Sequence, residues 1–119
     1  MTSLPRIQKA GYIPIAMGGQ DWQETLLFDH VALGAGGAQY FRELLDGNMD
    51  TIDSDDTTRV FAAMRTLAPY TDAGKAGRSW GDTNNLVITG KAAFFFMGDW
   101  AKGGFLQAKK TPGQDFSCH

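Results

Sequence analysis

The sequence has very little cysteine, no long apolar run and no cluster of positive charge. Its single cysteine, Cys118, cannot form a disulfide within the chain and fits no metal-site spacing. The thiol is therefore either incidental or one half of a disulfide with a cysteine outside this sequence. No apolar run approaches the roughly 20 residues that a membrane-spanning helix needs, and the opening MTSLPRIQKAG lacks the apolar core of a signal peptide. We expect no membrane insertion and no export signal within this sequence.

The balance of charge excludes a further class of partner. The formal net charge is −2 and the isoelectric point is near 5.5, without a basic cluster. This argues against nucleic acid or an anionic membrane surface as a principal partner. The 119 residues, 43% hydrophobic and 20% charged, are enough for one globular domain. We take residues 1–119 as a single domain.

Glycine is abundant, at 15 residues, and it punctuates the chain instead of repeating at a fixed period. The apolar spacing and the helix-stop signals predict secondary structure on this framework. Asp21 is expected to cap the second helix with Glu24 in a capping box, Ser54 to cap the clearest helix, and Asp82 to cap the next. The predicted elements are helix at 3–10, strand at 12–18, helix from 21 to a break at 34–37, helix at 38–47, helix at 54–68, helix at 82–89, strand at 91–98 and helix at 99–109.

This order is typical of a helix-rich α/β fold. The strand at 91–98 contains three consecutive phenylalanines and is predicted to be fully buried, whereas Pro14 restricts the strand at 12–18 to a sheet edge or to pairing on one side. Two strands are too few for a self-sufficient sheet. We therefore expect the chain to be part of something larger, or to pair its strands with another copy in a homo-oligomer.

Both predicted strands end in the same style, with glycine, a polar side chain and tryptophan. The first ends as MGGQDW (17–22) and the second as MGDW (97–100). Ligands of open α/β folds gather at the carboxyl ends of strands. A carboxylate or amide can bind sugar hydroxyls while an indole covers the C–H face, so the pattern favours a neutral sugar. The alternative is that Asp99 only caps the last helix and that Trp22, Trp80 and Trp100 pack in the core.

Other candidate sites are weaker. His30 is interpreted as a packed or surface histidine, and His119 is terminal. The glycine-rich segment 74–81 lacks the Gly-Lys-Ser/Thr of a P-loop, and GAGG (34–37) does not complete a dinucleotide-binding fingerprint. We expect no catalytic residue, no metal and no cofactor.

Four segments together resemble the carbohydrate-binding receptors of bacterial ABC transporters, nearest to the glucose/mannose-type branch of the extracellular solute-binding family. They are KAGYIPIAMGGQDWQETLLFDHVAL, FAAMRTLAPYTD, GRSWGDTNNLVITGKAAFFFMGDWAKG and TPGQDFSC, and the resemblance covers residues 4–118. It implies a part of the C-terminal lobe of a two-lobe, type II periplasmic-binding-protein fold. The N-terminal lobe and the hinge would lie outside this sequence. It also implies a periplasmic parent protein, an ABC permease as its partner, and a cysteine further along that pairs with Cys118.

The resemblance assigns roles to residues that match its motifs. Asp99 matches a carboxylate that binds sugar hydroxyls, Trp80 an aromatic that stacks on the ring, and Gly98 a residue close to the ligand. Trp22 and Gln20 match the cleft side. Trp100 is interpreted as packing, and the role of Lys102, which could pair with Asp99, stays open. Gly104 departs from the acidic residue expected there, which puts the stability of the last helix in doubt.

Two other functions remain open. A carbohydrate-active enzyme would need a second carboxyl roughly 5–10 Å from Asp99, supplied by Asp21 or Asp82. Alternatively, the chain could assemble by exchanging strands with another copy. The favoured prediction is a non-catalytic receptor lobe for a glucose-like monosaccharide, impaired in binding when it is alone.

Overall fold

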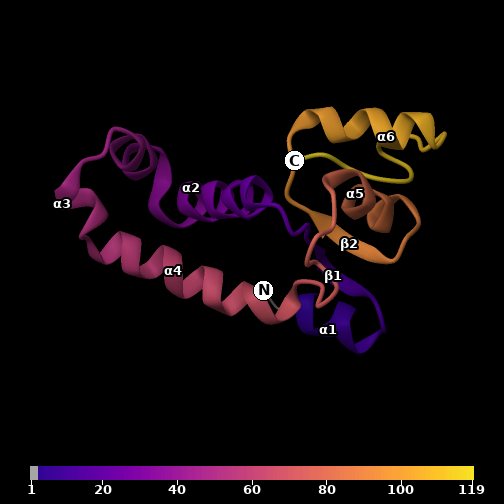
Figure 1. Cartoon of the computed structure of the whole chain (residues 1–119), viewed down its shortest axis with the longest axis horizontal. Helices are drawn as coiled ribbons and strands as arrows, with labels where there is room; N and C mark the ends of the chain where they lie inside the picture. The colour runs from indigo at the N-terminus through magenta and orange to yellow at the C-terminus, as the bar shows by residue number, and fades with distance from the viewer. Residues whose placement is uncertain (1–2) are drawn as a thin grey trace.

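The computed structural model describes residues 3–119, and it divides into two regions (Figure 1). A helical arm, residues 31–67, extends to one side and ends at its tip in the short helix α3 (Met49–Ile52). A head, residues 3–30 and 68–119, surrounds the two strands. The overall extents of 46 × 29 × 29 Å reflect the projection of the arm.

The sheet of the head has two parallel strands, β1 (Ile13–Ala16) and β2 (Ala92–Phe95). Ile13 lies opposite Ala92, and the N–H of Ile13 donates to the carbonyl of Lys91 at 3.0 Å. Successive N–H groups of a strand point to opposite edges, so Pro14 directs its missing N–H away from β2. Among residues 3–119 that other edge carries only an isolated bridge to Thr71, which confirms the prediction for Pro14.

The β2 strand is less buried than its three phenylalanines predict. Ala92 is buried, but Ala93 is exposed and Phe94 is 47% exposed. Helix α5 (Trp80–Ile88) packs against the strands, and α1 (Ser3–Lys9) packs against β1. No other strand in the described part of the chain pairs with β2. The prediction of a fully buried strand is therefore wrong for this chain, because an apolar run alone does not show whether both faces are covered.

The arm is built by α2 (Asp21–Leu45), α3 and α4 (Asp55–Leu67). Helix α2 changes direction at Gly37, whose φ of 84° lies in the region that favours glycine, which confirms the predicted break at 34–37. Ala32, Tyr40 and Val60 form the buried core between α2 and α4. The four-residue helix α3 was not predicted, because it is too short to show a period.

The helix caps agree with prediction at one position of three. Ser54 caps α4 by accepting the N–H of Thr57. Asp21 does not cap α2, because the extended residue before the helix is Gln20 and Asp21 already lies in the first turn. Helix α5 begins before Asp82: Ser79 accepts the N–H of Asp82 at 3.1 Å and donates to its carboxylate at 2.8 Å. Asp82 is thus the third residue of the helix and not its cap.

The remaining short helices follow proline or glycine. The 3₁₀ helix η1 (Ala68–Tyr70) contains Pro69, which ends α4 as predicted. After β2, the chain forms η2 (Asp99–Ala101) and α6 (Lys102–Gln107), shorter than the helix predicted at 99–109. No helix within residues 3–119 has both the length and the apolar character to cross a bilayer.

Candidate functional site

The candidate site begins where the two parallel strands end. Ala16 lies opposite Phe95, so the segments 17–22 and 97–100 leave the sheet at the same edge. Parallel strands place their carboxyl ends together, and this is where ligands of α/β folds bind. The two motifs, which the sequence showed to be alike, therefore converge in the fold.

A third segment joins this edge through backbone contacts. The N–H of Gly19 donates to the carbonyl of Arg78 at 3.1 Å, and the Arg78 Nη1 donates to the carbonyl of Met17 at 3.4 Å. Trp80 follows as the first residue of α5. We call residues 17–22, 78–80 and 97–100 the strand-end edge; it holds all five residues predicted to bind sugar.

Asp99 presents an exposed carboxylate at this edge. The residue before η2 is Gly98, and no side chain caps this turn or the start of α6. Within residues 3–119, neither a hydrogen bond nor an ion pair occupies the Asp99 carboxylate, and Lys102 does not pair with it. The alternative that Asp99 only caps the last helix is therefore wrong.

The tryptophans of the edge are not core residues. Trp22 is 39% exposed, Trp80 is half-buried and Trp100 is 52% exposed. A Cβ atom at Gly98 would lie 2.0 Å from Cζ3 of Trp100, so the indole covers the backbone of Gly98. Trp100 therefore packs, as interpreted, but against Gly98 and not into the following helix. Trp100 follows Asp99 in the sequence, and its ring folds back over the backbone of Gly98.

Sequence reasoning missed an ion pair between Arg78, a residue of the strand-end edge, and Asp72. The Arg78 guanidinium pairs with Asp72, and the two side chains are only 19% and 14% exposed. Burial raises the pKa of Asp72, but the Gly74 N–H and the Arg78 guanidinium outweigh that effect and hold its pKa below the ordinary value. Because Arg78 also reaches the Met17 carbonyl, the pair fixes the loop 72–78 against the end of β1.

Gln23 is the second residue that the sequence did not single out. Its side chain is buried, and its Nε2 donates to Oε1 of Gln20 at 2.8 Å and to the carbonyl of Arg78 at 3.4 Å. A Cβ atom at Gly18 would lie 1.9 Å from Oε1 of Gln23, so Gly18 makes room for this amide. A polar residue in the first turn of an amphipathic helix was the only signal available.

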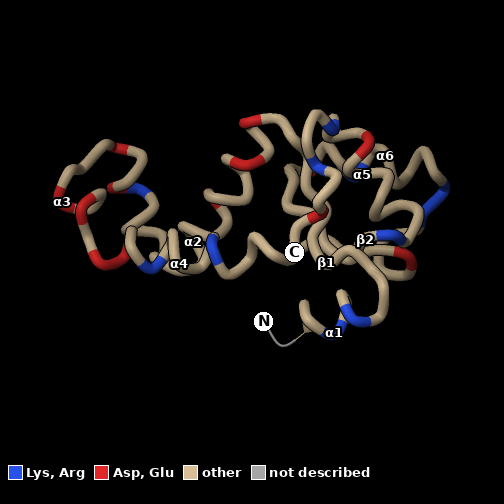
Figure 2. Tube along the Cα trace, turned by 60° about the horizontal axis from the view of Figure 1, so that its bottom comes forward, with Lys and Arg blue, Asp and Glu red and all other residues tan. Residues whose placement is uncertain are grey.

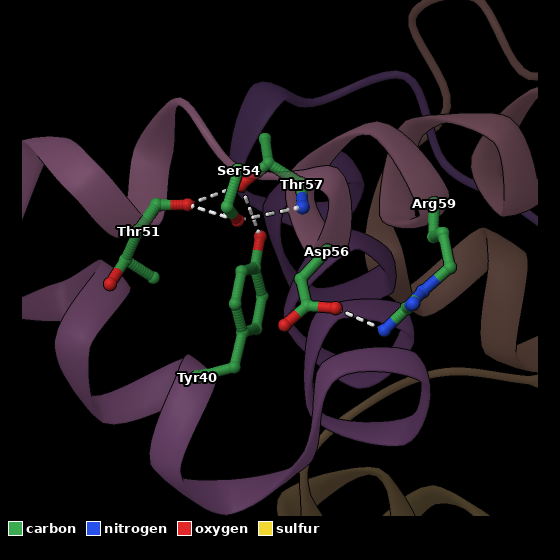
Figure 3. Close-up of polar contacts among 6 residues, drawn as sticks. All are labelled: Tyr40, Thr51, Ser54, Asp56, Thr57 and Arg59. Carbon is green, nitrogen blue, oxygen red and sulfur yellow. Dashed lines mark hydrogen bonds and ion pairs between the residues drawn. The ribbon is translucent and has the colours of Figure 1, made fainter.

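Outside the edge, the arm carries its own polar network (Figure 3). The Tyr40 hydroxyl lies 2.9 Å from Oγ1 of Thr57, which donates to the carbonyl of Thr51 at 2.9 Å, and Ser54 donates to the same carbonyl at 2.6 Å. A groove of about 480 Å³ lies beside this network. It is lined by α4 and the residues before it, and it holds none of the predicted sugar-binding residues.

The charged residues and His30 lie as follows. Figure 2 shows acidic and basic residues interspersed along both the arm and the head. His30 is exposed and its ring lies edge-on to Phe96 with centroids 5.4 Å apart, which agrees with its interpretation as a packed or surface histidine. Within residues 3–119, no group of three or more His, Cys, Asp or Glu residues could hold a metal ion.

Comparison with known proteins places this chain in a family. The model of the family described as bacterial extracellular solute-binding protein matches residues 2–117. A probable sugar-binding periplasmic protein of Mesorhizobium japonicum is 42% identical over 117 residues. An uncharacterized ABC transporter extracellular-binding protein of Pyrococcus horikoshii is 28% identical over 116 residues and 95% of this chain. The alignment with the Mesorhizobium protein covers 98% of this chain but only 28% of that protein, and the alignment with the Pyrococcus protein covers only 26% of that protein.

A solved structure supports the same relationship. The bacterial solute receptor AcbH, described as having an exclusive preference for β-D-galactopyranose, superposes with a TM-score of 0.77. It is 26% identical, and the match covers 87% of this chain and 26% of that receptor. The helix-rich α/β arrangement predicted from the sequence is thus shared with a solute receptor.

Proposed function

The chain belongs to the bacterial extracellular solute-binding protein family, and on that premise we propose that it forms part of the C-terminal lobe of a periplasmic sugar receptor. The receptor delivers a monosaccharide to an ABC permease and performs no catalysis. The strand-end edge is the half of the binding site that this lobe supplies. The relatives are described as sugar-binding, periplasmic and ABC-transporter proteins, which supports this assignment.

One observation carries the proposal. At the edge of the parallel sheet, the exposed carboxylate of Asp99 has no partner within residues 3–119, and it lies in sequence between Gly98 and the exposed indole of Trp100. A carboxylate without a partner accepts hydrogen bonds from sugar hydroxyls, and charge-assisted hydrogen bonds are the strong ones. Trp80 and Trp22 supply aromatic faces from the neighbouring segments, and Gln20 supplies an amide.

The ligand that we propose is glucose or a close analogue such as mannose. A neutral sugar fits an edge that combines one carboxylate, one amide and indole rings, without a cluster of basic residues. The chain spans 28% of the length of its Mesorhizobium relative, so we propose that the rest of the receptor encloses the sugar from the other side. The 119-residue chain alone is then expected to bind glucose weakly or not at all, because an open half-site lacks enclosure.

Assembly of two copies is the second candidate. The free edge of β2 and the exposed ring of Phe94 favour it, since an uncovered strand edge invites pairing with another strand. Light scattering of the 119-residue chain distinguishes the two: a dimer that persists at micromolar concentration supports strand pairing between copies. If the chain is a monomer, we propose that the free edge of β2 pairs with another part of the receptor.

Titration calorimetry on the intact receptor tests the proposed site. Asp99→Ala should weaken glucose binding by about 10- to 100-fold, the loss of hydrogen bonds to a charged group. Trp100→Phe keeps an aromatic face and should weaken binding by no more than about threefold. The reverse order would contradict the assignment of Asp99, and turnover of an aryl glycoside would favour an enzyme instead.

A further inference from the structure

Gln20 and Gln23 form a pair of amides whose hydrogen-bond directions are fixed by the backbone. The Arg78 carbonyl accepts the N–H of Gly19 at 3.1 Å and also faces Nε2 of Gln23 at 3.4 Å. A carbonyl only accepts, so the group of Gln23 that faces it must be the NH₂. If the Gln23 amide were reversed, two oxygens would face each other in a buried position.

The orientation of Gln23 in turn sets that of Gln20. The second N–H of Gln23 points to Gln20, 2.8 Å away, and an N–H requires an acceptor there. The group of Gln20 that faces inward is therefore Oε1. Its NH₂ is left on the outer side, where Gln20 is exposed at the strand-end edge.

The burial of Gln23 makes this arrangement hard to reverse. Gln23 is 1% exposed and its Oε1 has no partner within the described residues. Gly18 packs directly against that amide, and a reversed amide would turn its oxygen toward the Arg78 carbonyl. A buried amide that leaves one acceptor unsatisfied is costly, and it is retained here by the two hydrogen bonds that its NH₂ makes.

We propose that Gln23 is a positioning residue that makes Gln20 present a hydrogen-bond donor to the sugar. This inference rests on the proposed function and adds to it. The edge then offers the ligand two different groups: the Asp99 carboxylate, which only accepts, and the Gln20 NH₂, which only donates. The hydroxyl that meets Gln20 is bound through its oxygen lone pairs, whereas the hydroxyl that meets Asp99 is bound through its hydrogen.

The first test needs no sugar. Proton exchange of the side-chain amides, followed by NMR on the 119-residue chain, should show the NH₂ of Gln23 exchanging at least about tenfold more slowly than that of the exposed Gln107. Gln20→Ala removes one acceptor and should speed the exchange of Gln23. An NH₂ of Gln23 that exchanges as fast as that of Gln107 would overturn the proposed polarity.

The second test uses analogues of D-glucose on the intact receptor. Fluorine accepts weakly but cannot donate, so at the hydroxyl that meets Gln20 the deoxyfluoro sugar should bind about three- to tenfold more tightly than the deoxy sugar. When ionised, Gln23→Glu has the same shape but cannot donate, so at a pH that ionises it Gln20 reverses its amide and the preference for fluorine should disappear. Gln8→Glu is the matched control, because Nε2 of Gln8 also donates to a backbone carbonyl, that of Pro69, at 3.2 Å but lies outside the edge.

The outcomes separate this inference from the proposed function. A fluorine preference that survives in Gln23→Glu but is lost in Gln20→Ala would overturn the positioning role of Gln23. A preference unchanged in both variants would remove Gln20 from the sugar site. If the intact receptor binds no sugar while the exchange pattern of Gln23 is as expected, the proposed function fails and the polarity of the amide pair stands.

Discussion

In the arm, partly buried polar groups find partners at most 17 residues away in the sequence, whereas in the head some reach groups 55 and 61 residues away. Thr51, Ser54 and Thr57 satisfy one another within a single turn between α3 and α4 (Figure 3). In the head, Gln23 meets the carbonyl of Arg78, and Asn84 meets the carbonyl of Ala101 at 3.1 Å.

Glycine allows close approach in both regions. In the head, Gly18 makes room for the amide of Gln23, and Gly104 makes room for that of Asn84, whose Nδ2 would lie 2.6 Å from an added Cβ. In the arm, Gly36 makes room for the ring of Tyr40, whose Cδ1 would lie 2.1 Å from an added Cβ, whereas Gly34 and Gly37 have nothing within 4 Å of such an atom. Within residues 3–119, both buried side-chain atoms without a partner, Oε1 of Gln23 and Oδ1 of Asn84, belong to the head. Both regions therefore use glycine for close approach and serine as a helix cap, and they differ in the buried amide oxygens that the head leaves without a partner among residues 3–119.

The largest expected difference between the regions concerns their ion pairs. Asp72→Asn should lower the free energy of unfolding by about 2–3 kcal/mol, because it leaves the buried Arg78 guanidinium without its charged partner. Asp56→Asn is the control: its pair with Arg59 is exposed in the arm, and its loss should cost under about 0.5 kcal/mol. Urea unfolding measures both. Equal effects would remove the distinction between the regions.

Two neighbouring glycines of α6 provide the next test. Gly104→Ala should lower the free energy of unfolding by about 1–2 kcal/mol, since the added methyl displaces Asn84 from the Ala101 carbonyl. Gly103→Ala meets nothing within 4 Å and should instead raise it by about 0.5–1 kcal/mol through helix propensity. Thermal unfolding compares the two. Stabilisation by both would show that the packing of α5 on α6 does not need the glycine.

A smaller effect is expected from the arm network. Tyr40→Phe removes the hydroxyl that meets Thr57, but Thr57 keeps its bond to the Thr51 carbonyl. The free energy of unfolding should fall by about 1 kcal/mol. Tyr12→Phe, at a side chain that is 54% exposed, should change it very little and serves as the control. A loss above about 3 kcal/mol would mean that the arm is as interdependent as the head.

The smallest effect concerns pH. The folded-state pKa of Asp72 is lowered, so its contribution to stability is fully present above its ordinary pKa of 3.8 and is lost as the pH falls through the lower folded value. Urea unfolding between pH 5 and pH 3 should therefore show a steeper loss for the wild type than for Asp72→Asn. Hydrogen bonds from Thr51 and Gln39 also lower the pKa of Glu43 in the arm, so Glu43→Gln tests whether the arm contributes to the same slope. Identical slopes for the wild type and Asp72→Asn would contradict the role of the ion pair.

Sequence reasoning was most accurate where the structure is local. The break in α2, the cap at Ser54 and the end of α4 at Pro69 each depend on a few neighbouring residues, and all are confirmed. The caps at Asp21 and Asp82 were misplaced by one to three residues, because several polar residues in a row compete for the same position.

The long-range features of the head could not be predicted in the same way. The convergence of the two strand ends was predictable, because parallel strands share their carboxyl edge. The Asp72–Arg78 pair and the amides of Gln23 and Asn84 depend on segments that meet only after folding. Gly104 was interpreted as a position that weakens the last helix. In the structure, the absence of a side chain at Gly104 leaves room for the amide of Asn84. The roles of the five edge residues in binding sugar stay predictions.

The pairing of β1 with β2 has a consequence for the order in which the chain folds. Ile13 must find Ala92 across most of the chain, with the whole arm between them. Joining such distant segments is slow, because the entropy of closing a long loop is lost before the contact stabilises anything. Helices α2 and α4 form from near neighbours and, once packed on Tyr40 and Val60, shorten the path between the strands. The arm is thus expected to form early, and the edge that presents Asp99 to form last.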